Sequence, residues 1–218
     1  MNKLITEFLG TLILVFVIGN TGLGNEPLAA IAIGSALMVA VYMGGPISGG
    51  HYNPAVSVAV WRRGKLGTAQ LLPYIAAQIA GAIVAALLVR SIHAGAAAVI
   101  DAAAVAKSTG TSAGPAAYAI FLAEFVWTFV LATTVLNVAT TKKAANNSYF
   151  GLAIGFTVFA GAVAVGRISG GVFNPAVHVG LIVLGAKFFS TIFLFWIAQF
   201  LGGFVAAFVF RRMNPDEE

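Results

Sequence analysis

Long apolar runs, separated by short polar segments, dominate the pattern of this chain. A helix needs about 20 apolar residues to cross the hydrocarbon core of a bilayer, and six runs reach that length. They lie near 4–24, 27–46, 70–91, 116–138, 149–166 and 187–210. Each run predicts a transmembrane helix, so the expected fold class is an all-α, multi-pass membrane protein with the lipid bilayer as its surroundings. No separate soluble segment stands out, and we expect one domain over residues 1–218.

Composition supports this interpretation and excludes several classes of protein. The chain is 60% hydrophobic and 9% charged, with a mean hydropathy of +0.95, whereas soluble domains carry about 25% charged residues. This argues against a cytosolic enzyme and against a disordered chain. The absence of cysteine excludes disulfides and thiolate metal sites. The net charge of +5 is scattered at the ends of the apolar runs, so we expect no nucleic-acid partner.

The distribution of Lys and Arg predicts the orientation of the chain. Six spans place both termini on the same side of the membrane, and basic residues favour the cytoplasm. The segments on the side of the termini hold eight basic residues: Lys3, Arg62, Arg63, Lys65, Lys142, Lys143, Arg211 and Arg212. The other side holds four: Arg90, Lys107, Arg167 and Lys187. We therefore expect cytoplasmic termini, with a plasma (inner) membrane location. Glu7 interrupts the start of the first run and no small-residue cleavage site follows it, which argues against a cleaved signal peptide.

The two halves of the chain repeat in one register, with half one at about 1–91, half two at about 116–212 and an outer connection at about 92–115 that could carry a short helix. An offset of 121 relates the matching segments, which are 32–34 and 153–155, 48–50 and 169–171, 53–56 and 174–177, and Gln78 and Gly81 with Gln199 and Gly202. Glu7 and Glu124 match with an offset of 117. Because each half has three spans, the second half is inverted in the membrane. Such inverted repeats place their working site near the midplane, where the halves meet.

Each half also contains an apolar segment that is too short to cross the membrane. In residues 46–64, Gly49 and Gly50 permit a sharp turn, Asn53 is a good N-cap and Pro54 suits the first helical position. Irregular backbone at membrane depth is tolerated only inside protein or along a cavity. We therefore predict a re-entrant half-helix from Asn53 to the cytoplasmic surface, and residues 167–185 repeat the construction from the opposite side.

Two inverted half-helices must meet at their N-termini, each of which carries about half a positive charge. Cations, including hydronium, are repelled at such a centre. The side-chain amides of Asn53 and Asn174 could donate hydrogen bonds into a passage there, which would reorient a water molecule and interrupt a proton relay. The alternative is that each asparagine only caps its own helix. The inverted repeat favours the pore role.

Glu7 and Glu124 lie at matching places inside the membrane, where a carboxylate is costly. They could form a proton relay or a cation site. We favour the other interpretation, in which they accept hydrogen bonds from the backbone of the half-helix loops, with Gln78 and Gln199 in the same supporting role. His51 could line the inner mouth or be structural, and the two remain open. No catalytic set, metal cluster or phosphate loop is present in the sequence, so we expect no enzyme, no cofactor and no metal.

These motifs resemble the major intrinsic protein family of aquaporins and aquaglyceroporins. The resemblance rests on two Asn-Pro-Ala boxes, each preceded by Ser-Gly-Gly, and on TEFLGT at 6–11 and AEFVWT at 123–128, and it covers nearly the whole chain. The boxes are Asn53, Pro54 and Ala55 in half one and Asn174, Pro175 and Ala176 in half two. The resemblance implies an aquaporin-like fold of six transmembrane helices with two half-helices in an inverted 3+3 repeat. It also implies passive transport and a homotetramer with one pore in each protomer.

The family's outer selectivity filter falls on four positions of this chain. Counting from the two asparagines, the resemblance places it at Ile33, Ala162, Gly171 and Val177. Most members have arginine at the last position, and water-selective members have an aromatic residue and a histidine at the first two. This chain has none of them, so we expect a wider and more apolar filter with a weaker barrier to cations. Arg167 could restore some positive charge at the outer mouth or could face the aqueous surface.

The prediction is a passive channel for small uncharged solutes, namely water, glycerol-like polyols and neutral metalloid hydroxides such as arsenite. The first alternative is a mainly water-selective channel. A second is a secondary transporter that uses Glu7 and Glu124 for coupling, because inverted repeats also occur in that class. A third, a non-conducting structural protein, would leave the two symmetric half-helices without a purpose.

Overall fold

The computed structural model describes residues 1–22, 26–93, 116–187 and 189–217, and these ranges are helices joined by short connections. The long helices are α1 (Asn2–Val17), α2 (Ala29–Ser48), α4 (Thr68–Ile92), α6 (Ala117–Thr140), α7 (Phe150–Ser169) and α9 (Ile192–Met213). Two short helices, α3 (Pro54–Arg62) and α8 (Pro175–Val183), lie between them in the chain. The remaining turns are a π-helix, η1 (Ile18–Gly22), and two 3₁₀ turns, η2 (Phe189–Thr191) and η3 (Pro215–Glu217).

Six candidate membrane spans occur in the described ranges, as the hydropathy pattern predicts. The largest differences from the predicted bounds are three residues. The first span ends at Thr21 instead of 24, the fifth ends at Ser169 instead of 166, and the last ends at Met213 instead of 210. The connection predicted at 92–115, with its possible short helix, falls almost entirely on residues 94–115, which lie outside the described residues.

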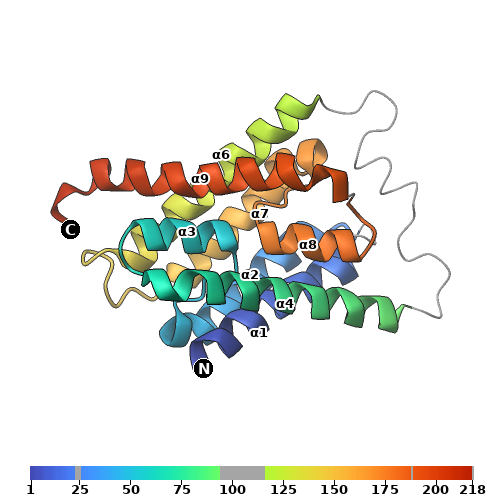
Figure 1. Ribbon diagram of the computed structural model, residues 1–218, viewed down its shortest axis with the longest axis horizontal. Helices are drawn as coiled ribbons and strands as arrows, with labels where there is room; N and C mark the ends of the chain where they lie inside the picture. Colours follow the sequence, from blue (N-terminus) through green and yellow to red (C-terminus); the bar gives the residue numbers. More distant parts are fainter. Residues whose placement is uncertain (23–25, 94–115, 188, 218) are drawn as a thin grey trace.

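The six long helices form one bundle (Figure 1), and corresponding helices pack together in the two halves. Helix α1 packs along α4 in the first half, and α6 packs along α9 in the second. The short helices α3 and α8 lie nearly in line between them, with their N-terminal ends facing each other (Figure 1). This is the arrangement of half-helices that the repeat predicts.

The main contact between long helices of different halves is between α2 and α7. At their crossing, a Cβ atom on Gly34 would lie 2.7 Å from the Gly155 carbonyl oxygen, and a Cβ on Gly155 would lie 2.7 Å from the Met38 Cβ. The two backbones therefore touch without intervening side chains. Small residues permit this close approach between membrane helices.

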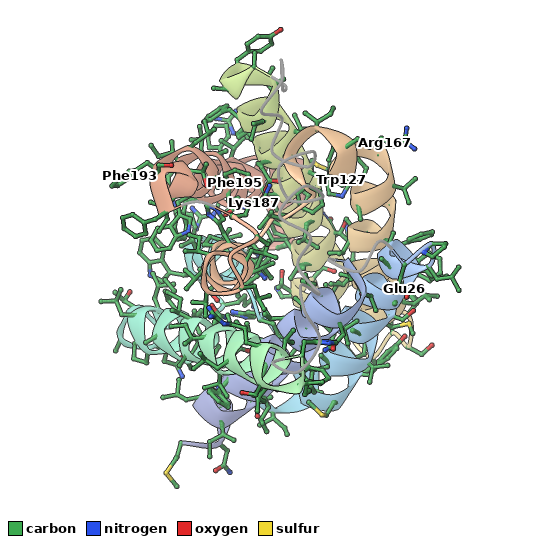
Figure 2. All side chains as sticks on the ribbon, turned by 90° about the vertical axis from the view of Figure 1, so that its right-hand side faces the viewer. Glu26, Trp127, Arg167, Lys187, Phe193 and Phe195 are labelled. Carbon is green, nitrogen blue, oxygen red and sulfur yellow. The ribbon has the colours of Figure 1, made fainter. Side chains whose placement is uncertain are left out.

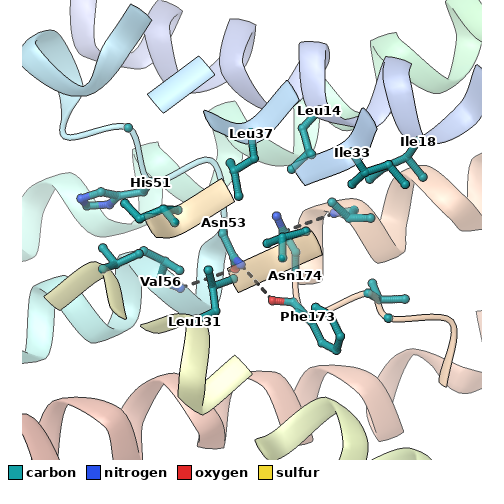
Figure 3. Close-up of a pocket in the computed structure, with 17 residues that line it drawn as sticks. Leu14, Ile18, Ile33, Leu37, His51, Asn53, Val56, Leu131, Phe173 and Asn174 are labelled. Atoms are coloured by element: carbon teal, nitrogen blue, oxygen red, sulfur yellow. Dashed lines mark hydrogen bonds between the residues drawn. The ribbon is translucent and has the colours of Figure 1, made fainter. Parts of the chain in front are cut away.

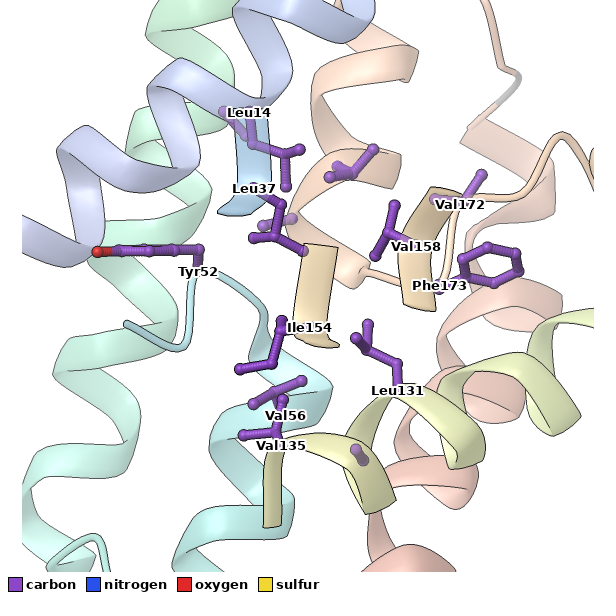
Figure 4. Packing of buried hydrophobic residues seen from close by; sticks show 14 of the residues in the cluster. Leu14, Leu37, Tyr52, Val56, Leu131, Val135, Ile154, Val158, Val172 and Phe173 are labelled. Atoms are coloured by element: carbon purple, nitrogen blue, oxygen red, sulfur yellow. The ribbon is translucent and has the colours of Figure 1, made fainter. Parts of the chain in front are cut away.

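Each half-helix is held mainly by the opposite half. Helix α3 packs on α9, and α8 packs on α4. Around the half-helices lies a buried apolar cluster that includes Val56, Leu131, Val135, Ile154 and Val158 (Figure 4). Many large apolar side chains are instead exposed on the outside of the bundle, as lipid contact requires. Examples are Val39, Leu72, Leu122, Val163, Phe193 and Phe208.

Candidate functional site: a path between the half-helix tips

The half-helices begin at Asn53 and Asn174, which have extended backbone and act as N-caps. The Asn53 Oδ1 accepts a hydrogen bond from the Ala55 N–H at 2.9 Å, and the Asn174 Oδ1 accepts one from the Ala176 N–H at 3.0 Å. In both helices the following proline occupies the first helical position, where its missing N–H has no cost. The capping interpretation is therefore correct for the oxygen atom of each asparagine.

The nitrogen atom of each asparagine reaches across to the other half, and Figure 3 shows the bond from Asn53. The Asn53 Nδ2 donates to the Phe173 carbonyl oxygen at 2.9 Å, and the Asn174 Nδ2 donates to the Tyr52 carbonyl oxygen, also at 2.9 Å. A carboxamide nitrogen has two N–H groups, so each asparagine uses one to join the halves and has one more to donate. The sequence indicates only the local cap and gives no sign of this cross-link.

Tyr52 and Phe173 carry the strained part of each loop. Their φ angles are +48° and +50°, a left-handed conformation that is unfavourable for large side chains and costs on the order of 1–3 kcal/mol. Both rings are buried. The conformation turns each carbonyl oxygen toward the asparagine of the opposite half, so the strain is tied to the cross-link.

Two fully buried glutamates hold the loops in this conformation. Glu7 accepts hydrogen bonds from the N–H groups of His51 at 3.0 Å and Tyr52 at 2.8 Å, and from the side chains of Ser48 and Gln78, both at 2.7 Å. All four acceptor positions of the carboxylate are thus used by protein groups. This geometry is the loop-anchoring arrangement that we favoured for Glu7 and Gln78.

The second half repeats the network around Glu124. Its carboxylate accepts from the N–H groups of Val172 at 3.0 Å and Phe173 at 2.7 Å, and from the side chains of Ser169 at 2.6 Å and Gln199 at 2.8 Å. The two serines are part of the Ser-Gly-Gly repeat, but the sequence alone did not assign them this role. The symmetry of the two networks gives the two half-helix tips the same support.

A narrow cavity passes the half-helix tips, and Asn53 and Asn174 both line it (Figure 3). It leaves about 30 Å³ for the centres of water molecules, which is room for about two of them. The remaining wall is mostly apolar and includes Leu14, Leu37 and Val177. The polar side chains in this wall are therefore the two asparagines and His51.

A wider cavity, which we call the Lys187 mouth, continues from one end of this constriction. The two share Ile18, Ile33, Gly171, Val172 and Val177 as wall residues. The Lys187 mouth leaves about 210 Å³ for water centres. All four predicted filter positions line it, together with the side chain of Lys187: Ile33, Ala162, Gly171 and Val177.

A third cavity, the Lys142 mouth, lies at the opposite end and shares His51 and Val135 with the constriction. It leaves about 400 Å³ for water centres. Three lysines, Lys3, Lys65 and Lys142, are among its lining residues. The three cavities thus follow one another through the bundle, with the smallest at the tips of the half-helices.

The two predicted mouth residues have different surroundings. His51 lines both the constriction and the Lys142 mouth, and its ring Nδ1 lies 3.1 Å from the Ser57 hydroxyl. Arg167 is exposed near the edge of the bundle, and the described walls of the Lys187 mouth do not include it (Figure 2). The basic side chain in that wall is Lys187, which the sequence showed only as a charge beside a span. At the offset of 121, Lys187 takes the place that Leu66 has in the first half. This replacement of a leucine by a lysine is the signal that could have identified it.

Comparisons with known proteins agree with this architecture. The family model described as "Major intrinsic protein" matches residues 1–210. The chain is 34% identical, over 100% of both chains, to "Glycerol uptake facilitator protein-like 6" of Lactiplantibacillus plantarum. It is 33% identical to "Probable aquaporin TIP2-2" of Oryza sativa subsp. japonica, over 95% of this chain and 85% of the relative. The solved aquaglyceroporin from Plasmodium falciparum superposes with a TM-score of 0.79 at 23% identity, over 99% of this chain and 95% of the other.

Proposed function

Because the chain belongs to the major intrinsic protein family, and is therefore a multi-pass membrane channel for water and small solutes rather than an enzyme, we propose that its filter admits a broad range of uncharged solutes. The proposed range is water, glycerol-like polyols and neutral metalloid hydroxides such as arsenite. The whole of residues 1–218 serves as one channel domain. This assignment makes the Lys187 mouth the site at which solutes are selected.

The observation that carries the proposal is the wall of the Lys187 mouth. Ala162 and Gly171 leave space, while Ile33 and Val177 present apolar surface to a solute. A strict water filter needs bulk and hydrogen-bond donors at such a point, because these exclude larger molecules and reward water. The carbon backbone of a polyol gains from apolar contact, and its hydroxyl groups can bind the asparagines further in.

The anchoring networks also favour a channel over the transporter alternative. A coupling carboxylate must bind and release an ion or a proton. Glu7 and Glu124 are fully buried and use their acceptor positions for loop N–H groups and side chains. They are therefore poorly suited to coupling, and the proposed flux is passive.

The test is a stopped-flow comparison of purified protein in liposomes with protein-free liposomes. We expect accelerated water efflux, and also glycerol and arsenite entry well above the lipid background. Rapid water flux without glycerol or arsenite entry would contradict the broad range. That result would support the mainly water-selective alternative, which the constriction of about 30 Å³ favours.

We further propose that the Lys142 mouth faces the cytoplasm of the plasma (inner) membrane, so that both termini are cytoplasmic. The lysines Lys3, Lys65 and Lys142 at this mouth support the orientation, since basic residues are retained on the cytoplasmic side. A protease that removes a terminal tag in inside-out vesicles, but not in right-side-out vesicles, would agree with it. The reverse pattern would contradict it.

The proposed assembly is a homotetramer with one pore in each protomer. Exposed apolar side chains on the outside of the bundle, such as Val39 and Phe193, provide surface for either lipid or neighbouring protomers. Native mass spectrometry in mild detergent should give four times the protomer mass of 22.4 kDa. A stable monomer that still conducts glycerol would contradict this assembly.

A further inference from the structure

Lys187 lies at the filter although it is not one of the four predicted filter positions. It follows α8, is only 9% exposed and forms part of the wall of the Lys187 mouth. Its Nζ donates a hydrogen bond to the Ser169 carbonyl oxygen at 3.1 Å and lies 5.3 Å from the centroid of the Phe195 ring. Figure 2 shows Lys187 and Phe195 near the middle of this end of the bundle. The ammonium group is therefore held by the protein beside the path of the solute.

The charge of Lys187 is not cancelled by a direct ion pair. Among the described residues, the salt bridge is between Arg63 and Glu217, at the other end of the molecule. Burial lowers the pKa of Lys187, and the nearby Glu124 carboxylate opposes that shift. The Ser169 carbonyl and the face of the Phe195 ring both stabilise the charged form. A buried cation without a paired carboxylate is costly, so a purely structural role would be an expensive choice of residue.

The other half of the repeat shows that the structural role can be filled without charge. At the offset of 121, Leu66 corresponds to Lys187 and Tyr74 corresponds to Phe195. The Tyr74 hydroxyl donates to the Ser48 carbonyl oxygen at 2.8 Å, the equivalent of the bond from Lys187 to Ser169. The equivalent carbonyl oxygens thus accept a hydrogen bond from a neutral phenol at one end and from an ammonium group at the other.

We propose that Lys187 supplies the fixed positive charge of the filter and thereby excludes cations from an opening wide enough for polyols. It would replace the arginine that most family members have at the position of Val177. This inference rests on the proposed function. It assigns size selection to Ile33, Ala162, Gly171 and Val177 and charge selection to a side chain from a different loop. Arg167 is exposed at the edge of the bundle and has no part in the barrier.

The decisive variant transfers the neutral pair of the first half into the second. The double substitution Lys187→Leu with Phe195→Tyr removes the ammonium group and offers a phenol hydroxyl to the Ser169 carbonyl. Lys187→Arg keeps the charge. Arg167→Leu is the matched control, because it removes a basic side chain at the same end that does not line the cavity. Each protein is reconstituted in liposomes, and the entry of glycerol and of guanidinium, a small permanent cation, is measured in the same preparation.

We expect the guanidinium-to-glycerol permeability ratio to rise on the order of tenfold in the double variant, as for loss of a unit charge acting over about 12 Å at an effective dielectric constant near 20. Lys187→Arg and Arg167→Leu should keep the ratio within about twofold of the parent protein. An unchanged ratio in a double variant that still conducts glycerol would overturn the role of Lys187. An equal rise in Arg167→Leu would overturn it as well, because any basic residue at this end would then suffice.

The experiment separates this inference from the function on which it rests. If the parent protein carries neither water nor glycerol, the proposed function fails and the inference fails with it. If the parent protein carries glycerol while the ratio does not respond to the double variant, only the inference fails. Equal size-exclusion profiles of the variants verify that each one is folded.

Discussion

The two ends of the pore have the same backbone design and different side-chain chemistry. At both ends, a buried glutamate, a serine and a glutamine hold a loop whose aromatic residue has a positive φ angle. The Lys142 mouth is lined by His51, while Lys187 lines the opposite mouth, which has the smaller volume. The repeat therefore accounts for the scaffold, and the two mouths differ where His51 faces one and Lys187 the other.

The first and largest prediction tests whether the scaffold is equally important in both halves. Glu7→Gln and Glu124→Gln each replace a carboxylate oxygen with an N–H₂ group that faces buried donors. Each donor that loses its acceptor should cost roughly 1–3 kcal/mol. We expect both variants to show strongly reduced thermal stability in detergent, by similar amounts, in fluorescence-detected size-exclusion measurements. Glu26→Gln, at an exposed position, should be unaffected. Normal stability of one anchor variant would show that the halves are not supported alike.

The second prediction concerns the place where the halves touch. In Gly34→Ala the new methyl group would lie 2.7 Å from the Gly155 carbonyl oxygen, and overpacking of this kind costs about 1–3 kcal/mol. The melting temperature should fall clearly. Gly166→Ala on α7 is the control, since nothing lies within 4 Å of its Cβ position. Equal melting temperatures of the two variants would mean that the crossing can relax.

The third prediction sharpens the functional difference between the mouths. Val177→Arg adds bulk and charge to the wall of the Lys187 mouth, so glycerol permeability should fall on the order of tenfold, a barrier change of about 1.4 kcal/mol. Water permeability, measured on the same liposomes, should fall less because water is smaller. Unchanged glycerol entry would show that Val177 does not line the narrow part of the path for polyols.

The fourth prediction has the smallest expected effect and concerns the contact of the Glu217 carboxylate with the backbone of Lys142 and Lys143. Hydrogen bonds from the Lys142 and Lys143 N–H groups, and the charges of Lys142 and Arg63, lower the pKa of Glu217. A lowered pKa means that this contact is intact at neutral pH and is lost as the pH falls through the lowered value. Glu217→Gln at pH 7 should modestly increase hydrogen exchange over residues 141–149 and leave residues 170–187 unchanged. An equal increase in hydrogen exchange over both segments would contradict a local role of Glu217.

Much of this architecture could be predicted because its signals are local in the sequence. Hydropathy gave the six spans, the Asn-Pro pairs gave the starts of α3 and α8, and the common offset gave the inverted repeat. The glutamates were identifiable because a carboxylate inside a membrane needs a partner.

What the sequence did not reveal depends on groups that only the fold brings together. The donation from Asn53 to the Phe173 carbonyl joins residues 120 positions apart, and no local pattern encodes it. Lys187 looked like an ordinary residue flanking a span, because its carbonyl partner and its aromatic neighbour belong to other segments. Arg167 was the more obvious candidate by its place before the loop, but it lies at the edge of the bundle.

The contact between Gly34 and Gly155 has a mechanical consequence. Alternating access requires one half to rock against the other around the binding site. Here rocking would separate two backbones in direct contact and would strain both asparagine cross-links at once. We therefore expect the halves to act as a single rigid frame, so that a solute diffuses past a stationary constriction. Transport should then have the low activation enthalpy of diffusion in water. An outward flow of unlabelled solute should not drive labelled solute inward against its own concentration gradient.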